Sequence, residues 1–343
     1  MSLLAGLLLV GACASGPGEA EVVSNATDQA LIPAMTGAAE AAGALSTAAF
    51  GFCASAHPKA HEAAMDAWNR AKEAWEASEL TTFFGPAEML RTVSKVDYNP
   101  ISQDEIDALL GSDAVIDAAY VGDRASSVQR GLGAVEYVLF RDEAEAGEAR
   151  NCELTTAAAE VIADATRALQ EAWVESFDGG EPWADTFTVT IPSNQALGDL
   201  VSAFVETTKR QSLFELGKAL GISAPQPEIE AIPEGAAGAA AAMYRSQLVG
   251  IRDALAGGNP DSLGGLIRAR SAEVADTIDL LLEQSIEAIA ALDRPMRDIA
   301  RDDPERLVPI YEDIAELRMI FEADVVSLLD ITLGFSDTDG DTG

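Results

Sequence analysis

Apolar residues recur every three or four positions along most of the chain, which is the period of a helix with one buried face. The clearest stretch is 59–80, where Ala64, Trp68, Ala71 and Trp75 fall on one side. Because Trp68 and Trp75 are seven residues apart, both indole rings lie on the same face. We expect them in the core, with ligand stacking as the alternative.

The same period predicts most of the remaining chain to be helical, and Pro- and Gly-rich stretches separate the helices. One stretch, 183–192 (WADTFTVTIP), is β-like, and we expect an extended connector there. The chain is therefore predicted to be all-α, built as two four-helix-bundle-like halves. The further predicted helices cover 28–56, 102–111, 130–140, 152–176, 194–221, 235–257, 261–291 and 304–333.

A Pro-rich stretch, 223–234 (SAPQPEIEAIPE), is the best candidate for an internal boundary. It divides the chain into an N-terminal helical half, 28–222, and a C-terminal helical half, 235–343. Residues 13–27 are small and polar, and are predicted to form a flexible tether.

The first twelve residues, 1–12 (MSLLAGLLLVGA), carry no charge and resemble the apolar centre of a secretory signal peptide. The run is too short for a permanent membrane-spanning helix. Small residues directly before Cys13 match the bacterial lipobox, in which this cysteine is lipidated. The alternative is a chance cysteine after a plain signal peptide. The pattern predicts a cell-envelope lipoprotein facing the periplasm, and Ala14, where an aspartate often accompanies inner-membrane retention, favours the outer membrane.

The net charge of the chain limits the kinds of molecule that it can bind. The chain has 57 acidic and 22 basic residues, a formal net charge of -35. A surface this acidic repels phosphate backbones, so nucleic-acid binding is excluded. It suits a cation or a basic partner, or simply solubility in a salty medium.

Besides Cys13, the cysteines are Cys53 and Cys152. In an exported protein such a pair suggests a disulfide, and two buried free thiols are the alternative. A zinc site is not supported, because the chain has only two histidines. His57 and His61 have the four-residue spacing of metal ligands on a helix, but Pro58 marks a helix boundary between them.

Glu136 stands inside an apolar run, 130–140 (RGLGAVEYVLF), just after Gly131 and Gly133. Burying an ionised carboxylate is costly unless something pairs with it. Glu136 therefore either points to solvent or forms a salt bridge at a helix start, or marks a polar site between helix bundles.

Several short segments spread over the chain carry a resemblance to a known family. Together they are similar to the imelysin-like family, in the branch described as predicted periplasmic lipoproteins. The segments are Phe52-Cys53, the Trp68–Trp75 helix with Phe84-Gly85-Pro86 after it, the element from Arg130 to Tyr137, Cys152 with Trp173, Tyr244-Arg245-Ser246, and the ending from Leu333-Gly334-Phe335 to Asp339-Gly340-Asp341.

The resemblance implies two helical bundles with a site between them, and an envelope protein. Some members are iron-regulated or belong to iron-uptake systems, and the founding member was described as a metallopeptidase. The family motif is Gly-x-His-x-x-Glu: Gly131 and Glu136 match it, but Gly133 stands at the histidine position. The binding site is accordingly predicted around Arg130, Gly131, Gly133, Glu136 and Tyr137, with Gly85, Pro86 and Glu88 beside it.

The sequence contains no phosphate-binding loop, no His-Glu-x-x-His and no Gly-x-Ser-x-Gly. The favoured hypothesis is a non-enzymatic lipoprotein that binds a ligand or partner near Glu136, within iron or other metal acquisition. The alternatives are a structural adaptor and a metal-dependent peptidase. A metal ion, iron or calcium, is the candidate cofactor, with Glu136 as a ligand. Asp337, Asp339 and Asp341 also suggest calcium, although their spacing differs from an EF-hand loop.

Overall fold

The computed structural model describes residues 18–55, 57–255 and 259–334. Every regular element in these ranges is helical, which confirms the predicted all-α class. The predicted signal segment, Cys13 and the aspartates of the C-terminal tail lie outside the described residues. Within them, no helix combines the length and apolarity needed to cross a bilayer.

The first bundle is built on α2 (Ile32–Ser55), which packs along its length against both α3 (Pro58–Ser78) and α9 (Ala149–Val174). The short helix α7 (Gly131–Leu139) lies against both α3 and α9. Apolar faces at the predicted period meet inside this bundle, so Trp68 and Trp173 are fully buried. Shorter helices complete it: α4 (Thr92–Val96), α5 (Gln103–Leu110), α6 (Ala118–Asp123), α8 (Glu143–Ala146), and the 3-10 turns η2 (Glu79–Thr82), η3 (Gly85–Ala87) and η4 (Ser127–Gln129).

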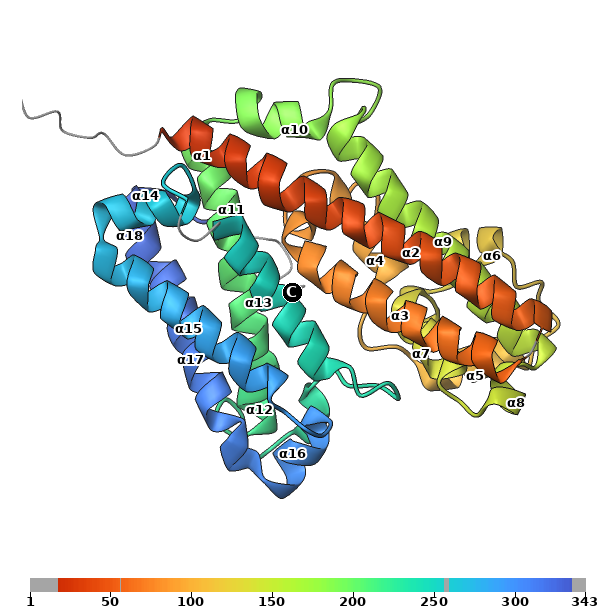
Figure 1. The fold of residues 1–343 in the computed structure, drawn as a ribbon. Coiled ribbons are helices and arrows are strands. Elements are labelled where there is room, and N and C mark those ends of the chain that lie inside the picture. The colour runs from red at the N-terminus through yellow and green to blue at the C-terminus, as the bar shows by residue number, and fades with distance from the viewer. Residues whose placement is uncertain (1–17, 56, 256–258, 335–343) are drawn as a thin grey trace, which may run out of the picture.

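The second bundle lies beside the first (Figure 1). Its core is formed where α11, α13, α15 and α17 pack together, with Phe204 against Phe321 at 5.2 Å between ring centroids. Its elements are α11 (Ser193–Lys209), η6 (Arg210–Leu216), α12 (Gly217–Ala219), η7 (Ile229–Ala231), α13 (Ala240–Leu255), α14 (Leu263–Arg270), α15 (Ala272–Ala290), α16 (Met296–Asp302), η8 (Pro304–Arg306), α17 (Val308–Met319), η9 (Ile320–Val325) and α18 (Val326–Leu329).

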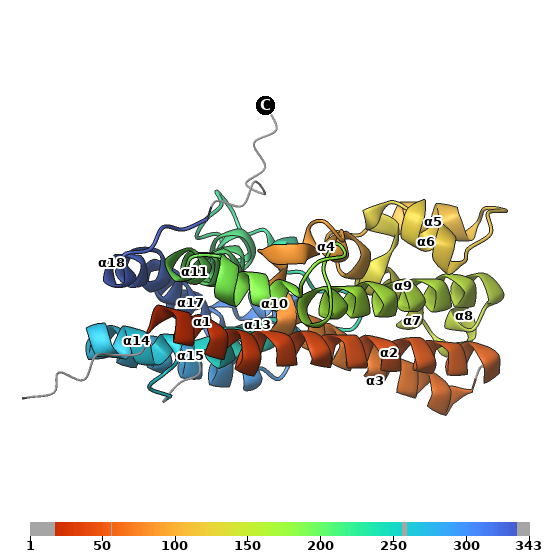
Figure 2. The ribbon, with the colours of Figure 1, turned by 90° about the horizontal axis from the view of Figure 1, so that it is seen from above.

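One long helix connects the two bundles. It begins as α1 (Glu19–Ala26), passes through the π-helical segment η1 (Thr27–Leu31) and continues as α2. Figures 1 and 2 show it running along both bundles, with α1 against α11 and α14. The prediction of a flexible tether over 13–27 was therefore wrong from Glu19 onward. The reason is that Val22, Val23 and Ala26 lie on one face and are buried in the second bundle.

The chain is also divided between the bundles differently from the expected 28–222 and 235–343. Helix α11 and η6 pack against α17 and η9, so residues 193–219 belong to the second bundle. The chain returns from the first bundle to the second through the segment before α11. There α10 (Trp183–Asp185) and the π-helical η5 (Thr186–Thr190) replace the predicted extended connector. Phe187 is buried in this segment and stacks on Phe84, with 5.0 Å between the two ring centroids. This contact holds the segment against the first bundle.

The predicted disulfide is confirmed. Cys53 in the last turn of α2 is bonded to Cys152 in the first turn of α9, with 5.5 Å between the two Cα atoms. The bond ties the far ends of two helices that pack along their lengths, and closes a loop with a sequence separation of 99 residues.

Candidate binding site at the junction of the bundles

Glu136 lies where the segment leading into α13 touches the first bundle. Its Oε1 accepts a hydrogen bond of 2.8 Å from the backbone N–H of Ala237. A Cβ at Gly235 would overlap the same carboxyl group, so the backbone there passes directly over it. Burial raises the pKa of Glu136, and the bond from Ala237 partly offsets that rise. Glu136 thus fastens the second bundle's leading segment onto α7.

The two glycines before Glu136 allow close packing at the start of α7. Gly131 has a φ of +79°, and a Cβ on it would lie 2.7 Å from the Val96 carbonyl oxygen. Gly133 is helical, and a Cβ there would lie 2.6 Å from Ile101 Cγ2. The place of the motif histidine is therefore filled by Ile101. The close approach at Gly131 also sets the position of the C-terminal end of α4.

Replacing Gly131 with alanine is expected to lower the free energy of unfolding by about 2–4 kcal/mol. The left-handed conformation disfavours any Cβ, and the Val96 carbonyl leaves no room for one. The matched control is Gly37→Ala in α2, where nothing lies within 4 Å of an added Cβ. That variant should gain about 0.5–1 kcal/mol, since alanine is the better helix former. Urea denaturation of both variants tests the pair, and equal losses would contradict the role given to Gly131.

Most of the other predicted site residues have local packing roles. Arg130 is buried, and its guanidinium donates to the carbonyl oxygens of Ser94 and Gly122 at 2.8 and 2.6 Å. The Tyr137 hydroxyl donates to Asp107 at 2.9 Å near the surface. The remaining three lie around η3: a Cβ on Gly85 would meet Trp183, Pro86 is buried, and Glu88 is exposed.

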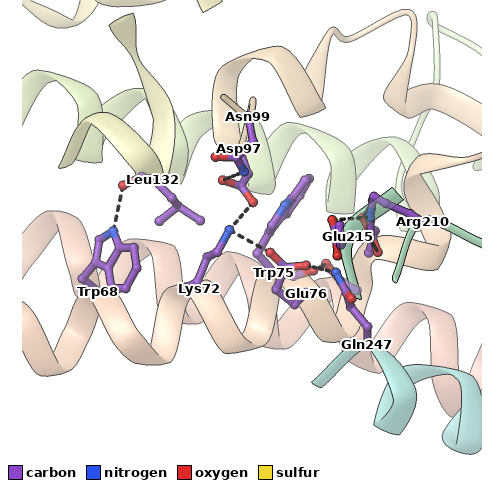
Figure 3. Close-up of polar contacts among 12 residues, drawn as sticks. Trp68, Lys72, Trp75, Glu76, Asp97, Asn99, Leu132, Arg210, Glu215 and Gln247 are labelled. Carbon is purple, nitrogen blue, oxygen red and sulfur yellow. Dashed lines mark hydrogen bonds and ion pairs between the residues drawn. The ribbon is translucent and has the colours of Figure 1, made fainter. Parts of the chain in front are cut away.

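A cluster of buried charged side chains lies between α3 and the chain that follows α4. Lys72 and Glu76 are on α3, and Asp97 directly follows α4. Lys72 Nζ is 2.8 Å from Glu76 Oε1 and 2.5 Å from Asp97 Oδ2. All three side chains are at most 6 % exposed. Figure 3 shows Lys72 between the two carboxylates, with Asp97 reaching down from the chain that follows α4. Paired in this way, the charges satisfy the condition under which ions are tolerated in a protein interior.

The pKa values reflect this arrangement. Burial alone would lower the pKa of Lys72, but Asp97 and Glu76 hold it above its ordinary value. Burial raises the pKa of Asp97 to about 6, against the opposing charge of Lys72. Burial also disfavours ionised Glu76, but Lys72 and Arg210 outweigh it and the net pKa is lowered. The ammonium group and Glu76 are therefore charged at neutral pH.

Two glutamines extend the cluster into the second bundle. Gln247 Nε2 on α13 donates to Glu76 Oε2 at 2.5 Å, and Gln211 Nε2 on η6 donates to Gln247 Oε1. Both glutamines are buried. The hydrogen-bonded chain from Lys72 to Gln211 therefore crosses the junction between the bundles.

A second ion pair borders the same region. Arg210 donates to both carboxylate oxygens of Glu79, at 2.5 and 2.6 Å, and its Nε is 3.6 Å from Glu215 Oε1. Because π-helical hydrogen bonds join residues five apart, η6 brings positions 210 and 215 onto one face. Burial raises the pKa of both Glu79 and Glu215, with Arg210 opposing the rise in each case.

Most of these groups, though not Lys72 or Gln211, line a cavity of about 230 Å³. Two buried atoms on its wall, the Tyr244 hydroxyl and Glu215 Oε2, have no well-aligned hydrogen bond among the described residues. The two side chains lie against each other, and no further group in the described part of the chain satisfies either of these two atoms. Glu136 is not part of the wall. The lining residues are Trp75, Glu76, Glu79, Thr82, Val93, Asp97, Tyr98, Asn99, Arg210, Glu215, Pro233, Met243, Tyr244 and Gln247.

The sequence contains a signal for this cavity outside the family motif. Lys72 and Glu76 follow Trp68 at intervals of four, so both fall within the apolar face that predicted the helix. A charged pair inside an apolar stripe indicates the same kind of buried polar site that was inferred for Glu136. The partners Asp97, Arg210 and Gln247 are brought in only by the packing of distant segments.

The sequence model of the imelysin family matches residues 31–318, most of the chain. This chain belongs to the imelysin family. Two solved structures share the fold. The first, described as a putative iron-regulated protein A precursor from Parabacteroides distasonis, has a TM-score of 0.79 at 19% identity. The second, an imelysin-like protein from Psychrobacter arcticum, has a TM-score of 0.73 at 18% identity. Each alignment covers 92% of this chain and 97% of the other. No curated protein matches the chain.

The metal site implied by the imelysin motif does not fit the residues at these positions. Gly133 offers no ligand atom, and Ile101 fills the space that a side chain there would need. One carboxylate oxygen of Glu136 is held by the Ala237 backbone. Across the described part of the chain, no three His, Cys, Asp or Glu side chains are arranged to hold a metal ion. Metal-dependent peptidase chemistry at the motif therefore has no support in these side chains.

Proposed function

We propose that this imelysin-family protein is a non-enzymatic binding protein of the bacterial cell envelope, anchored to the membrane through Cys13. It binds a small ligand in the cavity at the junction of the bundles, within iron or other metal acquisition. The observation that carries the proposal is the cavity itself, because its wall combines charged side chains from both bundles with a Tyr244 hydroxyl and a Glu215 oxygen that have no partner beyond each other among the described residues. Buried polar groups normally make their full set of hydrogen bonds, so incompletely bonded groups facing a cavity favour a ligand that completes them.

The envelope location is supported by two independent features. The lipobox ends at Cys13, and the Cys53–Cys152 disulfide is of the kind that persists in oxidising compartments such as the periplasm. The link to iron rests on the Parabacteroides distasonis relative, whose name describes an iron-regulated protein.

Native mass spectrometry of the protein purified from its own bacterial envelope tests the proposal. We expect a non-covalent small-molecule adduct on the wild type that is lost in Val93→Trp. Val93 lines the cavity and is 39% exposed, so an indole there narrows the mouth without entering the core. The matched control is Val189→Trp in η5, where Val189 is 80% exposed and the cavity is not involved.

Retention of the adduct in Val189→Trp and its loss in Val93→Trp would support binding in the cavity. An adduct kept by both variants would place the ligand elsewhere. No adduct on any form would contradict ligand binding and favour the adaptor function, in which only the helix faces matter.

A further inference from the structure

The cavity has more carboxylates than cations. Four acidic side chains line it, and only Lys72 and Arg210 balance them. Lys72 is shared between Glu76 and Asp97, and Arg210 between Glu79 and Glu215. With all four carboxylates ionised, each shared pair has one excess negative charge. The excess therefore lies at two places on the cavity wall.

Two incompletely hydrogen-bonded atoms lie at one of these two places. Tyr244 is fully buried, and its hydroxyl lies against Glu215. Neither the hydroxyl nor Glu215 Oε2 has a well-aligned hydrogen bond to any other group in the described residues. Both residues line the cavity. A hydroxyl oxygen and a carboxylate oxygen that contact only each other still have free lone pairs, so together they can accept hydrogen bonds from an ammonium group, which has donors and no acceptor.

We propose that the cavity binds a small aliphatic diamine, with one ammonium group at Glu215 and Tyr244 and the other at Glu76 and Asp97. This identification of the ligand class rests on the proposed binding function of the same cavity. Two separate excess charges match a dication that has its charges at its two ends.

The remaining wall also suits such a ligand. Trp75, Tyr98 and Tyr244 present aromatic rings, which attract ammonium groups through their faces and pack against methylene chains. A bare metal ion is disfavoured because no ligand set of three acidic, histidine or cysteine side chains exists in the described residues. The net charge of -35 raises the local concentration of any cation near the surface.

Isothermal titration calorimetry of the full chain with 1,4-diaminobutane at pH 8 tests the inference. We expect saturable 1:1 binding, weakened about tenfold or more in Glu215→Gln, which keeps the shape and removes the charge. Tyr244→Phe should weaken binding about fivefold, through the loss of one hydrogen bond. Glu62→Gln is the matched control, because it makes the same charge change at an exposed position on α3 and should leave the affinity unchanged.

Butylamine, glutarate and manganese chloride are titrated in parallel. Butylamine should bind about tenfold or more weakly than the diamine, because it offers a single charge, and glutarate should not bind. Absence of binding by the diamine, or equal affinity in Glu215→Gln and Glu62→Gln, overturns the inference, and so does saturable manganese binding in its place. If the native protein still carries an adduct that is not an amine, only the ligand class is wrong. If the native protein carries no adduct at all, both the ligand class and the proposed binding function are wrong.

Discussion

Replacing Lys72 with methionine is expected to lower the free energy of unfolding by about 3–5 kcal/mol at pH 8. The substitution keeps most of the side-chain volume but leaves Glu76 and Asp97 buried without the cation that they share. Breaking a buried pair by removing one partner costs more than the pair itself contributes, since the remaining charge cannot return to water. Urea denaturation at constant salt measures the loss.

The loss should shrink at pH 5.5. Without the ammonium group, the pKa values of Asp97 and Glu76 rise in the folded state above their unfolded values. A carboxyl group whose folded pKa is raised stabilises the fold while it is protonated, and this stabilisation is lost as the pH rises through the folded pKa. In the wild type the pKa of Asp97 is about 6 even though Lys72 lowers it. Without Lys72 this pKa should be higher, so in the Lys72→Met variant the Asp97 carboxyl group is mostly protonated, and therefore uncharged, at pH 5.5.

The control for Lys72→Met is Arg167→Met on α9. Arg167 forms an ion pair with Asp164 at 2.8 Å, but the two side chains are 54% and 63% exposed. Exposed pairs contribute little, so this variant should lose at most about 0.5 kcal/mol and show little dependence on pH. A Lys72→Met loss as small as that of the control, or one that grows as the pH falls, would show that the cluster is not a buried ionic one.

The double variant Cys53→Ser/Cys152→Ser is expected to lose about 4–5 kcal/mol of unfolding free energy. The wild-type disulfide joins residues with a sequence separation of 99, and removing the bond increases the conformational entropy of that loop in the unfolded chain. The folded structure should change little, because α2 and α9 pack along their whole length. Urea denaturation under oxidising conditions gives the difference from the wild type.

A reducing agent provides the matched control for the disulfide. It should lower the stability of the wild type to that of the double variant and leave the double variant unchanged. A stability difference below about 1 kcal/mol would mean that the unfolded chain is already constrained without the bond. The Lys72 and disulfide effects should add when combined, since the two sites share no partners.

Much of the fold follows from local patterns in the sequence. Apolar residues at the helical period determine which segments become helices, because each must bury one face. The disulfide between Cys53 and Cys152 was predicted from the sequence, because the two cysteines occur as a pair in a chain with export features. Two local patterns were misleading: 183–192 looked extended, and 13–27 looked flexible. In each case burial of a few side chains, such as Phe187 and Val22, overrode the local composition.

The candidate site shows where local patterns stop being informative. The chain itself reveals Glu136 and Lys72 as charges within apolar faces, because a helix fixes which positions share a side. Tertiary packing alone decides what meets them: Ala237 at Glu136, and Asp97 and Gln247 around Lys72 and Glu76. These partners come from segments tens to more than a hundred residues away. Helical periodicity specifies which side of a helix is buried but not which other helix covers it. The cavity is lined by residues from several elements, so only the tertiary packing of those elements creates it.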